Sequence, residues 1–346
     1  MRRILIALFL ISLFSMQVAA AGLTAPPAPD HVEKFMPKDQ VNFLQGLLEV
    51  LRDALLHIRP DLKAAVRVCV SITAVIMAVS LLRTFPGGAE KTANLASSIG
   101  IALILLQTSN ALVNLAAATV MEISEYGKLL LPVMTAALAG QGAIGTSSAL
   151  YAATAFFDAL LTSLIGKLLT PMIYLYLLLA VAGSAVGEDT LKKLRDALKW
   201  FMTWAMKTIL YIYTGFIGIT GVVSGTTDAA ALKAAKITIS GIVPVVGGIL
   251  SDASEAVLVS AGVVKNAAGI YGFFAILAIW IAPFLKIGTH YLFLKATGAV
   301  CSIFASRENT DLIKDFASAM GLLLAMTGTI CLMLLISLVC FLRGVV

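Results

Sequence analysis

The stretch TANLASSIGIALILLQTSNALVNLAAATVM, residues 92–121, decides the fold class of this chain. It contains no Asp, Glu, Lys or Arg, and about twenty apolar residues in an α-helix are enough to cross a bilayer. Further apolar stretches occupy residues 65–82, 208–224, 267–285 and 316–342. Membrane β-strands alternate apolar and polar residues over about ten positions, whereas these stretches are longer and unbroken. The sequence therefore predicts an all-α polytopic membrane protein with about six or seven transmembrane helices.

The composition agrees with a membrane environment. Of 346 residues, 60% are hydrophobic and 13% are charged, and the mean hydropathy is +0.96. Soluble domains carry about 25% charged residues, so the lipid bilayer is the solvent that fits this chain. The net charge is +6, and the basic residues sit mostly at the ends of apolar stretches, as cytoplasmic anchors do. We therefore expect no nucleic-acid partner.

The N-terminus has the pattern of a secretory signal peptide, residues 1–21. Arg2 and Arg3 precede a short apolar core, and small residues end at Ala21; an uncleaved anchor is the alternative. Residues 22–60 then form an extracytoplasmic linker and an amphipathic helix that begins near Asp39 and ends before Pro60. Its apolar stripe needs the bilayer interface, the membrane domain (residues 61–346) or another protein as its partner.

Several segments between the apolar stretches are predicted as interruptions. Residues 122–128 read as an acidic loop, and residues 307–315 as a polar loop. Pro132 and nearby glycines favour one re-entrant hairpin plus one span in residues 129–187. With this count, the basic residues near 83–91 and 192–199 lie together on the cytoplasmic side, and Glu122 and Glu125 lie outside. Residues 286–306 are ambiguous.

The most basic stretch predicts an amphipathic helix that leads into the span at residues 208–224. Such a helix either stays at the cytoplasmic interface with snorkelling side chains or docks a cytoplasmic partner. The residues concerned are Lys192, Lys193, Arg195 and Lys199.

Residues 237–264 contain helix breakers and two acids, so a clean span is not expected there. Pro244, Gly247 and Gly248 precede Asp252 and Glu255. Irregular backbone at membrane depth is tolerated only where protein or water covers it. We therefore predict a re-entrant or broken helix that is covered by the rest of the bundle.

Charges inside the apolar stretches are the remaining chemical signal. Arg67, Asp158, Lys167 and Lys265 are costly in hydrocarbon and should face protein or water. They either form a polar pathway through the bundle or lie near the interfaces. Glycines from Gly215 onward form a smooth helix face that packs within the chain or between subunits of a homo-oligomer.

Motifs of enzymes are absent from the sequence. It contains no GxxxxGK[ST], no HExxH and no GxSxG, and its three histidines are far apart in the chain. We expect no catalytic residues, no cofactor and no metal site.

The central region resembles the stage III sporulation protein AE family. Pro132 and Pro283 also look like landmarks of that family. The residues that carry the resemblance include Asp228, Lys236, the run from Ile242 through Pro244 to Gly247 and Gly248, Ser251, Asp252, Lys265, Asn266 and Gly269. The candidate polar or re-entrant site consists of Asp228, Lys236, Pro244, Gly247, Gly248, Ser251, Asp252, Lys265 and Asn266.

The resemblance implies a function in endospore formation, in the mother-cell membrane that surrounds the forespore. It implies a non-catalytic, polytopic subunit of a secretion-like channel complex whose other members are a separate ATPase and ring-forming proteins. Two alternatives stay open. The chain is an independent secondary transporter that uses residues 244–265, or it is a membrane scaffold that only holds partners.

Overall fold

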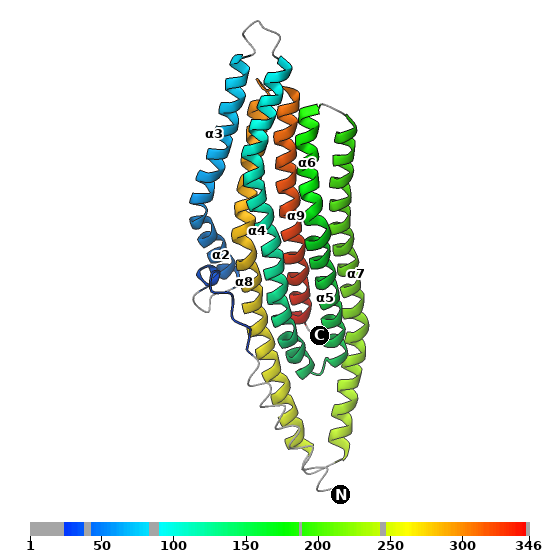
Figure 1. Ribbon diagram of the computed structural model, residues 1–346. Helices are drawn as coiled ribbons and strands as arrows, with labels where there is room; N and C mark the ends of the chain where they lie inside the picture. Colours follow the sequence, from blue (N-terminus) through cyan, green and yellow to red (C-terminus); the bar gives the residue numbers. More distant parts are fainter. Residues whose placement is uncertain (1–23, 38–42, 83–89, 187–188, 243–246, 344–346) are drawn as a thin grey trace.

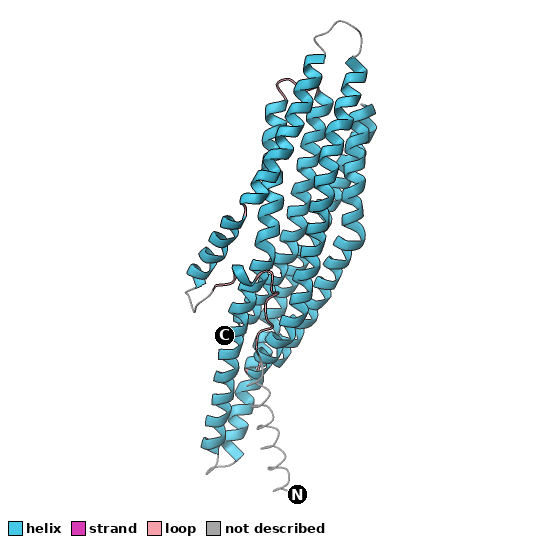
Figure 2. Cartoon of the chain, turned by 60° about the vertical axis from the view of Figure 1, so that its left-hand side comes forward, coloured by secondary structure: helices cyan, strands magenta, loops and turns pink. Residues whose placement is uncertain are grey.

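The computed structural model describes the backbone of residues 24–37, 43–82, 90–186, 189–242 and 247–343, with side chains described there except at 82, 90–91, 93–94 and 220–264. Every regular element within these ranges is a helix, which confirms the all-α class. The long helices run side by side along one axis (Figure 1), and a view turned by 60° shows the same arrangement (Figure 2). The predicted signal peptide and Asp39 lie outside the described residues.

Five continuous helical stretches of the described chain are long and apolar enough to cross a membrane: Arg59–Leu81, Leu95–Gly140, Ile144–Val186, Lys265–Cys301 and Arg307–Arg343. The predicted span at residues 208–224 lies within a further long helix, α7. In chain order the elements are η1 (Glu33–Phe35), α2 (Phe43–His57), α3 (Arg59–Leu82), α4 (Glu90–Gly140), α5 (Ile144–Leu164), η2 (Ile165–Leu169), α6 (Thr170–Val186), α7 (Asp189–Ile242), α8 (Gly247–Cys301) and α9 (Arg307–Arg343).

The predicted acidic loop at residues 122–128 is wrong, because α4 runs through it as one helix of 51 residues. Ile123, Tyr126 and Leu130 are buried at helical spacing, so the core-facing stripe continues through the charged segment. Pro132 lies inside the same helix. The charges of Glu122 and Glu125 occupy the half-buried and exposed sides of α4 and do not end it.

The predicted re-entrant hairpin within residues 129–187 is also wrong. Residues 129–140 complete α4, and a tight turn at Gln141–Ala143 leads into α5, η2 and α6, a single helical stretch of 43 residues. Gly142 has φ 90°, a conformation that favours glycine, so the glycine-rich cluster does mark the reversal of the chain. The two long helices on either side form an ordinary antiparallel pair.

The segments at 286–306 and 307–315 are mostly helical as well. α8 continues without a break to Cys301 despite Pro283, and α9 begins at Arg307, so the predicted polar loop is wrong. Ser306 precedes α9, and its side-chain oxygen accepts a hydrogen bond from the Asn309 backbone N–H at 3.4 Å. Such an N-cap explains why a charged segment begins a helix here.

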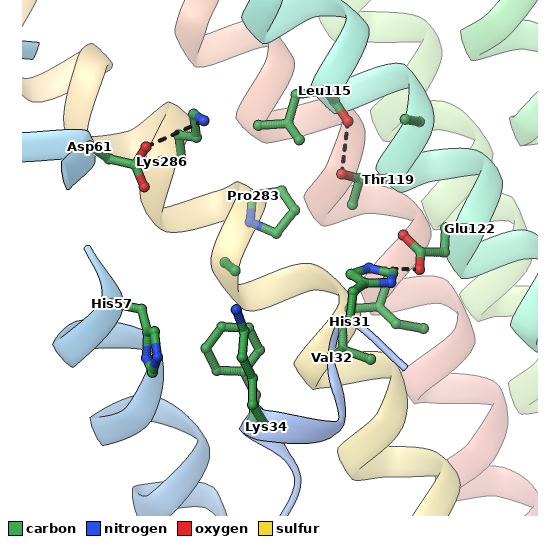
Figure 3. Close-up of a pocket in the computed structure, with 14 residues that line it drawn as sticks. His31, Val32, Lys34, His57, Asp61, Leu115, Thr119, Glu122, Pro283 and Lys286 are labelled. Atoms are coloured by element: carbon green, nitrogen blue, oxygen red, sulfur yellow. Dashed lines mark hydrogen bonds and ion pairs between the residues drawn. The ribbon is translucent and has the colours of Figure 1, made fainter. Parts of the chain in front are cut away.

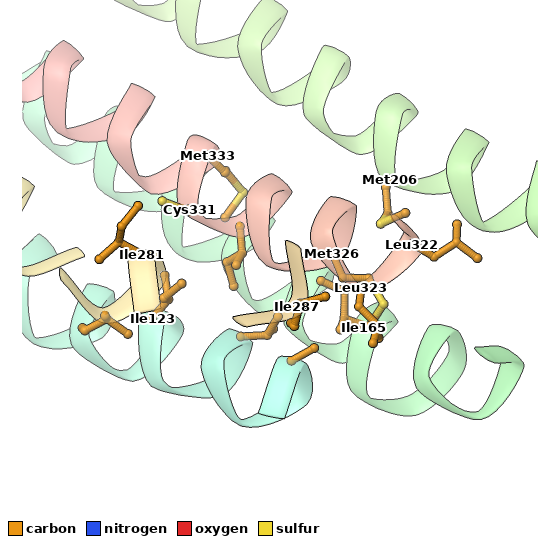
Figure 4. Packing of buried hydrophobic residues seen from close by; sticks show 14 of the residues in the cluster. Ile123, Ile165, Met206, Ile281, Ile287, Leu322, Leu323, Met326, Cys331 and Met333 are labelled. Atoms are coloured by element: carbon orange, nitrogen blue, oxygen red, sulfur yellow. The ribbon is translucent and has the colours of Figure 1, made fainter. Parts of the chain in front are cut away.

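The core of the bundle is centred on α9. Leu323, Met326 and Ile330 are fully or almost fully buried at helical spacing. They pack with residues of α4, α7 and α8, such as Ile123, Met206 and Ile287 (Figure 4). α9 is therefore the central helix around which α4 and α8 close.

Close approach between helices depends on two glycines of α8. A Cβ atom on Gly272 would collide with the side chain of Leu130 on α4, and one on Gly269 would collide with Leu342 on α9. Small residues let membrane helices approach closely enough for van der Waals packing. Gly218 on α7, in contrast, has no neighbouring atom within 4 Å of such a position.

This contrast predicts the effect of a leucine at each glycine. Overpacking a tight interface costs about 1–3 kcal/mol, so Gly272→Leu should lower the free energy of unfolding by that amount. Gly218→Leu is the matched control and should change it by less than about 1 kcal/mol, since leucine also favours the helix. Both values come from unfolding in mixed detergent micelles, and equal stability of the two variants would contradict the packing described above.

The amphipathic helix docks by a different face from the predicted one. α2 buries Gly46, Val50 and Ala54, and Gly46 meets the ring of Phe274 on α8. Its leucine stripe, including Leu44, Leu48 and Leu55, stays exposed. Pro60 follows the end of α2 and lies in the first turn of α3, where proline is well tolerated.

The two basic segments share one end of the bundle. The end of α3, the start of α4 and the start of α7 all lie there (Figure 1). That arrangement is the one that the predicted orientation requires. At the opposite end, α7 and α8 extend beyond α4 and α5 (Figure 1). These two helices have 54 and 55 residues, far more than the twenty or so that cross a bilayer.

Candidate functional site

A buried ion pair joins α7 to the central helix. The Arg195 guanidinium donates to the Asp315 carboxylate, and the two side chains are 11% and 12% exposed. Lys192 lies 3.6 Å from Asp311, and Lys199 Nζ donates to Ser318 Oγ at 3.3 Å. Lys192, Arg195 and Lys199 of α7 therefore each contact an acceptor of α9. Both sets of residues follow helical spacing.

This pairing changes the interpretation of the basic helix. Arg195 is buried against α9, whereas Lys193 is exposed and has no ion pair among the described residues. Three of the four residues proposed for partner docking are thus engaged within the chain itself. The sequence does not single out Asp311 and Asp315, because it predicts a polar loop over residues 307–315. The spacing of these residues is the signal that could have found them. Residues 311, 315 and 318 are three or four positions apart, as on one face of a helix, and so are residues 192, 195 and 199.

Asp158 is a second buried acidic residue, and it has no ion pair in the described part of the chain. It lies on α5 with 2% exposure, and Ser124 Oγ on α4 donates to its Oδ2 at 2.6 Å. Its other oxygen, Oδ1, has no hydrogen-bond partner in the described structure. An acidic group inside an apolar bundle lowers the stability of the fold, so acidic residues found there usually have a function. Asp158 is therefore a candidate functional residue.

A second polar cluster lies one turn before Asp158. Thr154 Oγ1 is 2.7 Å from Ser337 Oγ on α9 and 3.3 Å from the Tyr213 hydroxyl on α7. All three residues are fully buried. Together with Asp158 and Ser124 they place five polar side chains between α4, α5, α7 and α9, where the sequence alone indicated only Asp158.

A cavity of about 350 Å³ opens where α8 contains Pro283 (Figure 3). Proline lacks the N–H that would bond to the carbonyl of Ile279, so that carbonyl loses its helix partner beside the cavity. His31 Nε2 lies 3.0 Å from Glu122 on one side, and Lys286 lies 3.3 Å from Asp61 on the other.

Two further polar side chains line this cavity without a carboxylate partner in the described structure. Lys34 Nζ lies 4.9 Å from the centre of the Phe35 ring. His57 Nδ1 donates to the Asp53 carbonyl at 2.7 Å, which leaves its Nε2 available. The cavity can therefore hold a small polar molecule. Sequence reasoning missed it because its residues come from five separate segments.

Hydrogen bonds hold the segment before α2 against the bundle. The Ala28 backbone N–H donates to the Tyr271 hydroxyl at 3.1 Å, and the Tyr126 hydroxyl donates to the Pro26 carbonyl at 3.1 Å. Val32 and Phe35 are buried beside these bonds. This fastening forms one wall of the Pro283 cavity.

The two tyrosines predict how firmly that segment is held. A hydrogen bond contributes about 0.5–1.5 kcal/mol, so Tyr126→Phe with Tyr271→Phe should weaken the fastening by about 1–3 kcal/mol. Backbone amide exchange in residues 26–36 should then be about five to a hundred times faster. His31→Ala is the control, because its exposed pair with Glu122 contributes little. Unchanged exchange in the double variant would show that apolar burial alone holds the segment.

Most of the residues predicted for the central site cannot be placed by their side chains. Asp228 and Lys236 lie in α7, and Gly247, Gly248, Ser251 and Asp252 lie in α8, all with undescribed side chains. Pro244 lies outside the described residues, between the end of α7 at Ile242 and the start of α8 at Gly247. Lys265 is buried and Asn266 is exposed. A re-entrant site at these positions stays a prediction.

The predicted intramembrane charges are not brought together. Asp158 faces the interior, whereas Arg67 on α3 and Lys167 in the π-helical turn η2 are exposed on the outside of the bundle. A single pathway through the interior that uses all three is therefore not formed by the described residues. π-helical turns are frequent at functional sites, so Lys167 stays a candidate functional residue.

The model of the family described as stage III sporulation protein AE matches residues 31–343. The chain belongs to this family. A curated relative, stage III sporulation protein AE of Bacillus subtilis (strain 168), is 23% identical over 198 residues, which cover 57% of this chain and 50% of the relative. The chain thus spans about half the length of that relative. No solved structure matches the chain.

Membership of the stage III sporulation protein AE family confirms the resemblance and a role in sporulation. The five apolar helical stretches make this member a membrane protein. The family description names a sporulation protein and no enzymatic reaction. The matched region contains the cavity at Pro283, Asp158 and the Arg195–Asp315 pair, so all three lie within the part that defines the family.

Proposed function

We propose that this chain is a non-catalytic membrane subunit of a transport or channel complex that links mother cell and forespore and is required for forespore development. The observation that carries the proposal is the family match across residues 31–343, almost all of which fold as one helical bundle of membrane-crossing length. The sequence contains no GxxxxGK[ST] motif, which P-loop ATPases carry. Energy would come from a separate ATPase, and ring-forming proteins would continue the path between the membranes.

The mother-cell membrane that surrounds the forespore is the expected location. The basic end of the bundle, with Lys193 exposed, would face the mother-cell cytoplasm. The exposed leucine stripe of α2 would lie on the opposite side of the membrane, near the ring-forming partners. An exposed charge at the rim of an interface, such as Lys193, affects the association rate more than the affinity. Association of a cytoplasmic partner with the basic end should therefore become slower as the salt concentration rises.

Deletion of the gene tests this proposal in the spore-forming organism that carries it. Vegetative growth should be unchanged, and counts of heat-resistant spores should fall by several orders of magnitude, with arrest after engulfment of the forespore. A copy of the gene expressed only in the mother cell should restore the spores, whereas one expressed only in the forespore should not. Normal spore counts in the clean deletion would refute the proposal.

A second candidate function is independent transport of a small polar solute. The observation that favours it is the cavity of about 350 Å³ at Pro283, which is lined by Lys34 and His57, both without a carboxylate partner in the described structure, and by the Ile279 carbonyl. Transport by the purified chain in liposomes, abolished by Lys34→Met, would favour this candidate over a subunit role.

A further inference from the structure

One face of α4 carries side-chain amides on the outside of the bundle. Gln107, Asn110 and Asn114 are all exposed and lie at positions i, i+3 and i+7 of a stretch without charges. Large apolar side chains are exposed elsewhere on the bundle, such as Val70 on α3 and Ile212 on α7, and Arg67 on α3 is exposed as well. The amides therefore form a polar stripe on a bundle that also exposes many large apolar side chains.

α6 and η2 extend this stripe sideways. The Tyr174 hydroxyl lies 2.7 Å from Asn110 Oδ1 and 3.4 Å from Asn114 Oδ1, so an exposed hydrogen bond bridges α4 and α6. Lys167 is exposed two turns earlier on the same helical stretch, in η2. Among the described residues Lys167 has no ion pair, and the side-chain amide of Gln107 has no hydrogen bond.

Contact between this polar surface and lipid acyl chains is energetically unfavourable. Each polar group that faces hydrocarbon without a hydrogen bond is strongly disfavoured, and a lysine at depth more so. A dry interface with the same face of a second copy is also disfavoured, because the stripe contains no carboxylate and would oppose one Lys167 to another. Water satisfies amides, phenol and ammonium alike.

We propose that the face formed by Gln107, Asn110, Asn114, Tyr174 and Lys167 lines a water-filled passage in the assembled complex. The passage then runs along the outside of each bundle, between subunits, and does not run through the interior of one chain. An amide-lined passage with one cation per chain suits hydrated, neutral or anionic solutes. This inference rests on the proposed function, since it assigns the surface that a transport subunit would use.

Thiol labelling of membranes from sporulating cells tests the proposal. Gln107→Cys and Asn114→Cys are each introduced into the full-length chain. Right-side-out and inverted membrane vesicles of these cells are then treated with a membrane-impermeant anionic methanethiosulfonate. Val70→Cys and Ile212→Cys are the matched controls, because both are exposed apolar residues of long helices outside the stripe. The parent chain corrects for its own four free cysteines.

The two stripe positions should react at least ten times faster than the two controls. Equal rates at all four positions would overturn the proposal, and so would rapid disulfide formation between copies at Asn114→Cys, which indicates a dry contact. A membrane-permeant maleimide, applied to detergent-solubilised chain, verifies that each introduced thiol is present and reactive. Labelling and the deletion phenotype are independent, because spores can depend on the chain even when the stripe is protected from the reagent.

Discussion

Replacing Arg195 by alanine should lower the free energy of unfolding of the bundle by about 3–5 kcal/mol. The change leaves the Asp315 carboxylate 12% exposed and without the guanidinium that pairs with it. A buried charge that loses its partner keeps its full desolvation cost, which explains why the expected effect is large. The measurement is the detergent-unfolding midpoint of the purified chain, followed by tryptophan fluorescence.

Two controls separate the ion pair from general effects of charge. Lys193→Ala removes the neighbouring exposed cation and should change stability by less than about 1 kcal/mol. The double variant Arg195→Met with Asp315→Leu removes both charges and should recover most of the loss, because apolar pairs often replace buried ion pairs without cost. A small effect of Arg195→Ala would mean that water reaches Asp315 and that α7 and α9 are not closely packed there.

Asp158→Asn should leave the bundle folded and reduce heat-resistant spores at least tenfold. The asparagine oxygen can still accept the Ser124 hydrogen bond, which is 2.6 Å long in the structure, so the packing between α4 and α5 should survive. The ionisable carboxyl group and the unpartnered Oδ1 are lost. A carboxyl group kept inside an apolar bundle against its desolvation cost indicates a function for that ionisable group.

Ser124→Ala is the matched control for Asp158. It removes the same hydrogen bond, keeps the carboxylate, and should retain spore counts near those of the parent at equal protein level. If Asp158→Asn gives normal spore counts, Asp158 is a structural residue of the core. If Ser124→Ala fails and its protein level falls, while Asp158→Asn gives normal spore counts, the hydrogen bond is needed for folding and the ionisable group has no separate role.

The sequence predicted the fold class well because apolar stretches and helix periodicity are local properties. The apolar stretch at residues 92–121 is long enough by itself to predict a membrane helix, and it lies within α4. The other predicted apolar stretches also lie within long helices of the structure. The interruptions were harder to predict. The charges of residues 122–128 were read as a loop, but the buried stripe of Ile123, Tyr126 and Leu130 keeps α4 continuous.

The candidate sites show the same division between local and long-range information. Asp158 and Lys167 could be singled out, because a charge in an apolar stretch is visible in one dimension. Their orientation could not be predicted, since it depends on which neighbouring helix each face meets. The Arg195–Asp315 pair joins residues 120 positions apart, and the Pro283 cavity joins five segments. Only the packed bundle brings these groups together.

Isolation of the tagged chain from sporulating cells tests the central claim most directly. After extraction in mild detergent, this chain of 36.4 kDa should migrate in a much larger assembly that contains an ATPase and ring-forming proteins in fixed proportion. The same assembly should be absent when the gene for the ATPase is deleted. A chain that migrates alone at every stage of sporulation, while spore formation still depends on it, would contradict the account.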